Sequence, residues 1–376
     1  MDVISLINSL MENQKNLQEN YCMISQNIYP LKSIEDMGMN QFSMFLQKIR
    51  PLKLYKYFPN KWEIKDNSPV NYSLYALKNN TVFMQSPNLF DDIYDSSIGV
   101  EWNDYLHLRL KIYCTRCKCP INDDLNTQEL IYQLSKKLYS KYNECPDVFS
   151  VFESNENSEQ INLVNQLFVT NVLISLKETN DWNKAITKAI QREYTEYGEY
   201  LQKIFRISCF ATTPYSQLMW GGSYANEHRG FCLEYTIDLN SEYFQNLSHH
   251  LFPMIYCSNR PNITKELVYA KDEELSEKLF WDIHFHGTLR KSIDWAYQDE
   301  WRLLLPFSKS DTDYNVKFFD ITKVYLGNRM NKENRKEIID ICKSKKIPYI
   351  GVTIDNEKFA MKECAQLCED CGNYIG

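Results

Sequence analysis

One connection between two expected strands concentrates side chains that can bind a ligand. The strands are expected at Ile204–Phe210 and Gly230–Ile237, and connections carry function more often than the strands that they join. Paired glycines let a backbone approach a ligand closely, and aromatic faces stack on planar rings. The candidate binding residues in this connection are Trp220, Tyr224, His228 and Arg229. A well-packed aromatic hairpin explains the same pattern without a ligand.

A second cluster of polar and aromatic residues precedes a strand expected at Trp301–Pro306. Its members are Lys291, Trp295, Tyr297, Asp299, Glu300, Trp301 and Arg302. A carboxylate at the start of a buried strand, flanked by tryptophan and arginine, can orient a ligand hydroxyl or stabilise a cation. The alternative is a Glu–Arg pair that satisfies only itself at the sheet edge.

Two further patterns are compatible with metal binding. Asp91, Asp92 and Asp95 could bind a divalent ion, but they equally fit an Asx-rich turn after a proline. Six cysteines could form a zinc or iron–sulfur site, or could act as small apolar residues on helix faces. They are Cys114, Cys117, Cys119, Cys364, Cys368 and Cys371. No metal site is predicted from either pattern.

The bulk properties favour a cytoplasmic globular protein. The net charge is −7 and there is no long basic run, which argues against a protein that grips duplex DNA through its phosphates. The first residues do not resemble a signal peptide, and no apolar run approaches the roughly 18 residues that span a bilayer. Twelve cysteines without a secretory signal indicate reduced thiols in the cytoplasm.

Periodicity divides the chain into an N-terminal helical segment over residues 1–50 and an α+β core over 51–376. Apolar stripes predict a helical insertion at about 101–203 within that core. Further strands are expected at Leu54–Phe58, Thr81–Gln85, Phe252–Cys257, Lys323–Leu326 and Pro348–Val352, and further helices from Tyr72 to about Asn80 and from about Lys332 to Ser344. Phosphate-loop, dinucleotide-binding, zincin and nucleophile-elbow motifs are absent from the sequence.

The order of these segments resembles a bacterial family, domain of unknown function 2971. The matching motifs run from residue 54 to about 327, interrupted by the helical stretch. They are Leu54-Tyr55-Lys56-Tyr57; Ser86 with Asp91-Asp92-Ile93-Tyr94-Asp95; Cys209-Phe210-Ala211; Met219-Trp220 with Tyr224-Ala225; His228-Arg229-Gly230-Phe231-Cys232; and Lys291, Trp295 and Tyr297-Gln298-Asp299-Glu300-Trp301-Arg302. The chain departs from the family pattern at Asp91, Ile93, Gly221-Gly222-Ser223 and Gln298.

That family is similar to the ADP-ribosyltransferase fold, in which a split sheet holds NAD in a cleft. The resemblance implies an α+β fold with a split mixed or antiparallel sheet, N-terminal helices and a helical insertion. By the same analogy, Tyr55, Lys56 and Tyr57 lie on the first strand of the site, Ser86 ends the second, and Glu300 opens the third. Such a glutamate holds the nicotinamide ribose and stabilises an oxocarbenium-like transition state.

The resemblance therefore implies an NAD-consuming ADP-ribosyltransferase or NAD glycohydrolase, acting as a bacterial toxin or phage-defence effector. Glu300, Tyr57 and Ser86 are its expected catalytic residues. The expected NAD-binding residues are Tyr55, Lys56, Trp220, Tyr224, His228 and Arg302. Tyr57 and Trp220 would be stacking walls, and Lys56, His228 and Arg302 would bind phosphate or ribose.

NAD is the expected substrate, and the acceptor would be a protein or a nucleic acid. Two other functions stay open at this stage. The protein could be a non-catalytic sensor whose helical segments bind a partner protein or a second copy. It could also be a metal-dependent enzyme acting on nucleic acid through Asp91, Asp92 and Asp95.

Overall fold

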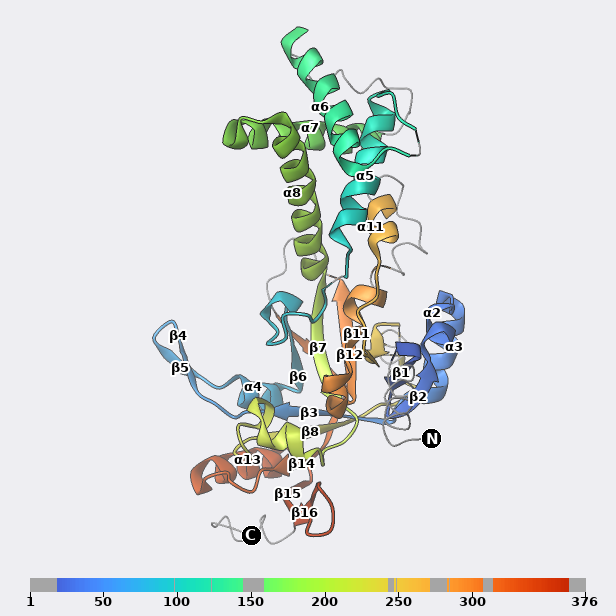
Figure 1. Ribbon diagram of the computed structural model, residues 1–376. Coiled ribbons are helices and arrows are strands. Elements are labelled where there is room, and N and C mark those ends of the chain that lie inside the picture. The colour runs from blue at the N-terminus through green and yellow to red at the C-terminus, as the bar shows by residue number, and fades with distance from the viewer. Residues whose placement is uncertain are drawn as a thin grey trace, which may run out of the picture. The chain divides into compact units, whose positions relative to one another are not determined.

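The protein has an α+β fold whose described part divides into two compact units (Figure 1). The computed structural model describes residues 19–97, 99–122, 124–144, 159–242, 247, 249–270, 283, 285–306 and 314–364. The sheet unit comprises Met1–Asp91, Ile204–Asn259 and Leu289–Gly376, and the helical unit comprises Asp92–Lys203 and Arg260–Thr288.

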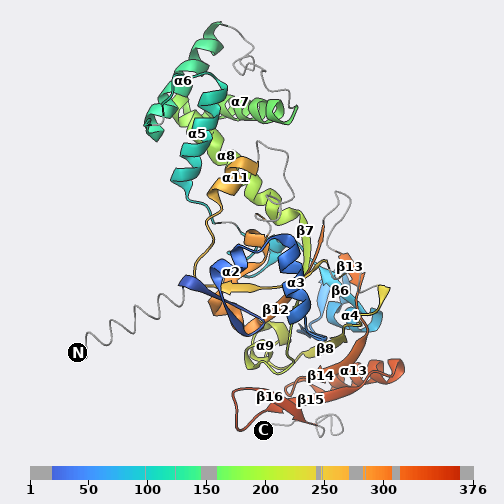
Figure 2. The ribbon, with the colours of Figure 1, turned by 90° about the vertical axis from the view of Figure 1, so that its right-hand side faces the viewer.

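An eight-stranded mixed sheet forms the centre of the sheet unit. Its order is β16 (Met361–Cys364), β15 (Tyr349–Ile354), β14 (Ile321–Leu326), β8 (Phe231–Thr236), β3 (Lys53–Phe58), β7 (Phe205–Ala211), β12 (Glu300–Pro306) and β9 (Leu251–Pro253). Neighbours are antiparallel except β14 and β15, which are parallel. The connection between these two is α13 (Lys332–Lys345), which runs beside them (Figure 2). Aromatic and β-branched residues dominate the strands, as suits a pleated sheet buried on both faces.

The sheet narrows to one residue pair between β3 and β7. β3 pairs with β8 along its whole length, but it meets β7 only at Tyr55 and Ala211. Beyond this pair the strands diverge, and the Lys56 side chain occupies the opening. Its ammonium group donates to the Ser208 hydroxyl at 3.0 Å and to the Cys209 carbonyl at 2.9 Å. The two halves of the sheet are therefore joined by very little strand pairing.

Three smaller sheets complete the sheet unit. One has the order β11 (Arg290–Ser292), β10 (Ile255–Cys257), β1 (Tyr21–Ile24) and β2 (Asn27–Pro30). A second pairs β6 (Thr81–Met84) with β13 (Tyr314–Lys317), and a third is the hairpin of β4 (Glu63–Lys65) and β5 (Ser68–Val70). The strand expected at Phe252–Cys257 is thus two strands, β9 and β10, which belong to different sheets. The Met254 amide between them donates to the Glu300 carbonyl at 2.8 Å.

The N-terminal segment contains a β-hairpin as well as helices. Its described helices are α2 (Leu31–Glu35) and α3 (Met39–Ile49), both within the segment 1–50 that was expected to be helical. The hairpin of β1 and β2 turns at Ser25 and Gln26, both with positive φ. Because such turns usually contain glycine or asparagine, the sequence carries no strong signal for this one. The first 18 residues of the segment expected to be helical lie outside the described residues.

Asparagine side chains begin both longer helices that pack beside the sheet. α4 (Tyr72–Asn79) starts where the Asn71 side chain accepts from the Leu74 amide, and α13 starts where Asn331 accepts from the Asn334 amide. Such caps satisfy backbone donors that a helix leaves unpaired. Both helices and both starting points agree with the sequence prediction.

The helical unit contains α5 (Trp102–Arg116), α6 (Thr127–Glu144), α7 (Glu159–Thr179), α8 (Trp182–Lys203) and α11 (Thr264–Ala270). A buried ion pair joins Arg109 to Glu193 at 2.9 Å, and the Tyr113 hydroxyl also donates to Glu193 at 2.7 Å. The sequence predicted one inserted segment at about 101–203, whereas this unit begins at Asp92 and includes a second segment, Arg260–Thr288. Within the described ranges, no helix is both long enough and apolar enough to cross a membrane.

Candidate functional site

Glu300 lies in one register row with residues of three other strands. It pairs with Ala211, which pairs with Tyr55, which pairs with Glu234. Because directly paired residues point to the same face of a sheet, these side chains share one face. Only the small Ala211 separates Glu300 from Tyr55 across the narrow junction between β7 and β3.

Two cationic side chains hold the Glu300 carboxylate. Arg302 Nε donates to Oε1 at 2.5 Å, and Lys291 Nζ lies 3.3 Å from Oε2. The side chains of Lys291 and Glu300 are 6% exposed, and that of Arg302 is fully buried. The Glu300 amide donates to the Tyr256 hydroxyl at 2.8 Å, so the backbone is held as well. The carboxylate is therefore ionised and oriented, as charge-assisted hydrogen bonds favour.

Positive charge exceeds negative charge in the immediate surroundings of Glu300. Lys56 also interacts electrostatically with Glu300, so three cations surround one carboxylate. Burial lowers the pKa of Lys56. Asp299 adjoins this cluster, but its carboxylate accepts hydrogen bonds from Gln26 and Thr212. A cluster with this balance suits an anionic ligand, because a phosphate oxygen can share the cations that hold Glu300.

The neighbouring thiol has no activated character. Cys209 pairs with Arg302 across β7 and β12, and is partly buried. Burial raises the pKa of Cys209, and the nearby Glu300 raises it further. The thiol is therefore protonated at neutral pH, which makes it a poor nucleophile.

A chain of hydrogen bonds leads from Glu300 to a partly exposed tyrosine. Lys291 Nζ donates to the Gln298 side-chain oxygen at 2.9 Å, and the Gln298 amide donates to the Tyr224 hydroxyl at 2.6 Å. Tyr224 is partly buried, and burial raises its pKa, so it remains neutral. Tyr215 and Tyr297 are partly buried beside the same apolar cluster. These three rings, unlike those deeper in the cluster, retain some accessible surface.

Tyr57 and Trp220, which the sequence predicted to be stacking walls, are buried. Their rings meet edge to face with centroids 5.3 Å apart. Trp220 is fully buried and its indole nitrogen donates to the Pro214 carbonyl at 2.7 Å, while the Tyr57 hydroxyl donates to the Thr213 carbonyl at 2.8 Å. The sequence identifies large aromatic residues but not which of them keep a face open to ligand. In this conformation Tyr215, Tyr224 and Tyr297 keep accessible aromatic surface beside this apolar cluster.

Tyr55 is close to Glu300 in the sheet, but its hydroxyl bonds to Glu234. Ser86 follows β6, which pairs with β13 and is joined to the main sheet by the bridge between Gln85 and Ile207. The Ser86 carbonyl accepts from the Leu89 amide in the turn that leads to Phe90, and the Phe90 ring lies 5.4 Å from the Arg302 guanidinium. Ser86 thus precedes a segment that reaches the cluster.

His228 lies in a separate part of the sheet unit. Its amide donates to the Trp220 carbonyl, and its described electrostatic neighbour is Arg329. Burial lowers the pKa of His228, and Arg329 lowers it further. Of the predicted NAD-binding residues, Lys56, Tyr224 and Arg302 therefore cluster around Glu300, while the described contacts of His228 involve other residues.

The structure adds residues to the site that sequence reasoning did not select. Gln298 and Cys209 stand in motifs named from the sequence but were not among the predicted site residues. Gln298 lies two residues before Glu300, whereas Cys209 reaches the cluster because β7 pairs with β12. Lys291 and Tyr297 belong to a cluster visible in the sequence, where a cation close to a conspicuous carboxylate was a usable signal. Tyr256 supports the Glu300 backbone from β10.

The patterns considered for metal binding have structural partners. Asp92 accepts from the Tyr94 amide, and Asp95 accepts from the Ser96 hydroxyl, as in an Asx-rich turn. Cys114 and Cys119 are buried in the helical unit, where Cys114 Sγ lies 3.5 Å from the Leu130 carbonyl oxygen. Cys368 and Cys371 lie outside the described residues. Among the residues that are described, no three His, Cys, Asp or Glu side chains are grouped as metal ligands would be.

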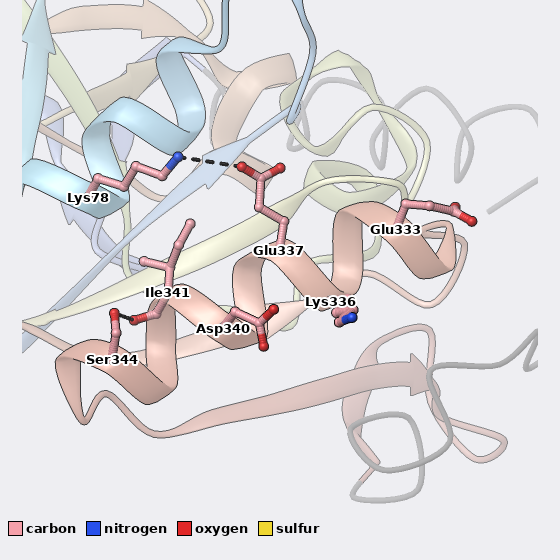
Figure 3. A pocket seen from close by; sticks show the side chains of 7 residues that line it. All are labelled: Lys78, Glu333, Lys336, Glu337, Asp340, Ile341 and Ser344. Carbon is pink, nitrogen blue, oxygen red and sulfur yellow. Dashed lines mark hydrogen bonds and ion pairs between the residues drawn. The ribbon is translucent and has the colours of Figure 1, made fainter.

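A hollow of about 510 Å³ lies elsewhere on the sheet unit, beside α4 and α13 (Figure 3). Its lining residues are Lys78, Glu333, Lys336, Glu337, Asp340, Ile341 and Ser344. Lys78 and Glu337 pair with each other at 3.4 Å, and the other charged side chains in the view project from α13 without converging on one point. This hollow contains none of the groups that surround Glu300, so it is not the candidate site.

Comparison with known proteins identifies one similarity. A family model described as "Protein of unknown function (DUF2971)" matches residues 219–303. This range runs from α9 (Gln217–Gly221) into β12 and contains Tyr224, Lys291, Glu300 and Arg302. The resemblance expected over residues 54 to about 327 is thus confirmed for 219–303. No curated protein and no solved structure matches the chain.

Proposed function

We propose that this protein consumes NAD in the manner of an ADP-ribosyltransferase, with Glu300 as its catalytic carboxylate. The observation that carries the proposal is an oriented, buried carboxylate at the opening of β12, flanked by Lys291 and Arg302 and next to the narrow junction of the sheet. The resemblance to the ADP-ribosyltransferase fold supplies the reaction, and the charge balance around Glu300 supports an anionic substrate.

The reaction breaks the bond between the nicotinamide nitrogen and the ribose carbon, and nicotinamide leaves with the bonding electron pair. The ribose carbon develops positive charge, which a fixed carboxylate stabilises without reorganising. A nucleophile on the acceptor, or water, then bonds to that carbon and loses a proton. Glu300 would thereby stabilise the transition state and orient the ribose.

Binding of the diphosphate would prepare Glu300 for this role. In the structure, Arg302 and Lys291 are engaged with the carboxylate. Diphosphate oxygens would compete with the Glu300 carboxylate for both cations, and Lys56 would bind the same diphosphate. The carboxylate would then be left to face the ribose. Tyr224 and Tyr297 are the aromatic residues proposed to contact a planar ring, with Tyr55, Tyr57 and Ser86 in supporting positions.

The cellular role proposed is that of a cytoplasmic toxin or defence effector in bacteria, with a protein or nucleic acid as acceptor. This role rests on the contexts in which members of the resembling family occur. The chemistry of Glu300 can be tested without knowing the acceptor, because nicotinamide is released in either reaction.

The test is nicotinamide release from NAD by the purified full-length protein. Replacing Glu300 with glutamine should lower turnover by roughly 100-fold or more, the loss that follows removal of one transition-state stabilising group. The matched control is Glu193→Gln, because Glu193 is also a buried carboxylate paired with a buried arginine, in the helical unit. It should lower stability but leave turnover per folded molecule unchanged.

Two outcomes would remove the proposal. Turnover by Glu300→Gln equal to that of the unmodified protein would show that the carboxylate has no catalytic role. Negligible turnover by both, with candidate protein and nucleic-acid acceptors supplied, would show that the protein does not consume NAD.

A further inference from the structure

Three backbone segments meet at unusually short range where β3 ends, β8 begins and β14 ends. A Cβ atom at Gly230 would lie 2.0 Å from the Phe58 carbonyl oxygen, and one at Gly327 would lie 2.1 Å from that of His228. The Gly327 and Arg329 amides donate to the carbonyls of Gly230 and His228 at 3.0 Å each. We name this place the glycine junction. Glycine is required there because any side chain would force the segments apart.

The junction holds a strained loop on its outer side. Asn226, Glu227 and His228 all have positive φ, at 49°, 53° and 67°. Such conformations are unfavourable for residues other than glycine and persist only where the surroundings impose them. Here the backbone hydrogen bonds of the loop impose these conformations. The Glu227 amide donates to the Gly222 carbonyl, and the His228 amide donates to the Trp220 carbonyl. The loop therefore presents the side chains of residues 227–229 in a fixed arrangement.

The charges gathered at the loop are mostly positive. Arg229 pairs with Glu227 at 2.6 Å, and Arg329 and Lys61 also interact electrostatically with Glu227. Three cations thus share one carboxylate. All three come from different segments, and Arg229, Arg329 and Lys61 are exposed, so an anion from solution can reach them.

Two buried polar atoms at the same place have no hydrogen-bond partner among the described residues. They are His228 Nδ1 and the side-chain oxygen of Asn328. Buried polar atoms are nearly always paired, so unpaired ones point to a partner that binds from outside. The imidazole nitrogen of His228 can donate to an anionic oxygen, and the side-chain oxygen of Asn328 can accept from a hydroxyl group. The pair therefore suits a ligand that has both kinds of group.

We propose that the glycine junction, with Lys61, His228, Arg229 and Arg329 around it, is a binding site for a phosphate group. The ligand class is a phosphate ester or pyrophosphate, bound through charge-assisted hydrogen bonds from the arginines. Glu227 occupies these cations when the site is empty and acts as a competitor for the anion. This site shares none of these residues with the proposed Glu300 cluster, so its occupancy and NAD turnover are separate properties.

The experiment is calorimetric titration of the full-length protein with inorganic pyrophosphate at constant ionic strength. Replacing Arg329 with glutamine should weaken binding at least tenfold, because it removes a cation that faces the anion. Arg192→Gln is the charge-matched control, since Arg192 pairs with Glu178 on the surface of the helical unit. It should leave the affinity unchanged.

A second variant tests the competition directly. Glu227→Gln should tighten pyrophosphate binding several-fold, because it removes the carboxylate that shares the cations. AMP and inorganic phosphate, titrated in parallel, should each compete with pyrophosphate if the site binds phosphate groups. Failure of both to compete would contradict a phosphate-ester site. Glu300→Gln should bind pyrophosphate at this site as the unmodified protein does, even if it has lost NAD turnover.

The proposal is overturned if the unmodified protein fails to bind pyrophosphate, or if Arg329→Gln and Arg192→Gln weaken binding equally. It is also overturned if Glu227→Gln weakens binding, which would mean that the carboxylate only braces the arginines. Circular dichroism of each variant separates these results from loss of the fold.

Discussion

Two buried glutamates in the same sheet row illustrate how surroundings decide the role of a residue. Glu234 accepts from Lys53, Thr322 and Tyr325, each at 2.9 Å, and these partners leave it fully engaged in holding adjacent strands together. Glu300 is instead held by cations that a phosphate can share. The same type of side chain therefore has a structural role at Glu234 and is a candidate for catalysis at Glu300.

Trp220 provides a test at the scale of a single residue. Replacing it with phenylalanine removes the indole donor and leaves the buried Pro214 carbonyl unpaired. The expected cost is about 1–3 kcal/mol, increased by the cavity that the smaller ring leaves. Thermal unfolding should show the loss, whereas the KM for NAD, measured per folded molecule, should not change.

Trp62→Phe is the control for this variant, because Trp62 is 54% exposed immediately before β4. Its stability should remain within about 0.5 kcal/mol of the unmodified protein, as for most surface substitutions. A raised KM in Trp220→Phe with unchanged stability would favour the stacking role expected from the sequence over a structural one.

At the scale of elements, the packing of backbone segments matters more than the propensities of individual strands. β3, β8 and β14 converge at Gly230 and Gly327, and this convergence positions both the His228 loop and the start of the matched family region. Strand β12, which carries Glu300, is likewise held in place by its pairing with β7 and β9. The candidate sites lie where elements end and meet.

Gly230→Ala should destabilise the protein by roughly 1–3 kcal/mol or more, because the added methyl group meets the Phe58 backbone, which cannot move aside freely. Gly198→Ala is the matched control. Gly198 lies within α8 and a Cβ there would meet nothing within 4 Å, so this change should stabilise by roughly 0.5–1 kcal/mol. Urea unfolding of both variants measures the contrast. Equal effects would contradict the packing described for the glycine junction.

At the scale of the whole molecule, two partly buried histidines link stability to pH. Burial lowers the pKa of both His228 and His250 from an ordinary value of 6.5. The folded state therefore binds these protons less readily than the unfolded state. The stability associated with the neutral rings is fully present above about pH 6.5 and is lost as the pH falls through the folded-state pKa values.

Calorimetric unfolding between pH 7.5 and 5 should accordingly show a falling transition temperature below about pH 6.5. The variant with His228→Asn and His250→Asn should show a smaller fall over the same range. Asparagine is chosen at position 228 because it tolerates positive φ. An unchanged slope in the double variant would assign the pH dependence to other groups.

Much of the secondary structure follows from local pattern. α4 and α13 agree with their predicted ranges because a capping asparagine and an apolar stripe lie within a few residues of each other. The strands β3, β7 and β14 also agree with their predicted ranges, because the local pattern of alternating and aromatic residues favours a strand. The hairpin at Tyr21–Pro30 escapes prediction because its turn residues, Ser25 and Gln26, give no turn signal, and because the strand β10 beside it is more than 200 residues away in the chain.

The sequence by itself determined the α+β class, most of the helices and strands, and the concentration of chemically capable residues near positions 220–232 and 291–302. These are properties of composition and short-range spacing. Only the tertiary structure decided that Lys291, Gln298 and Tyr224 form a chain from Glu300, and that Trp220 is buried. The reason is that burial and hydrogen bonding between distant segments depend on how strands are ordered and where they diverge, which local interactions do not specify.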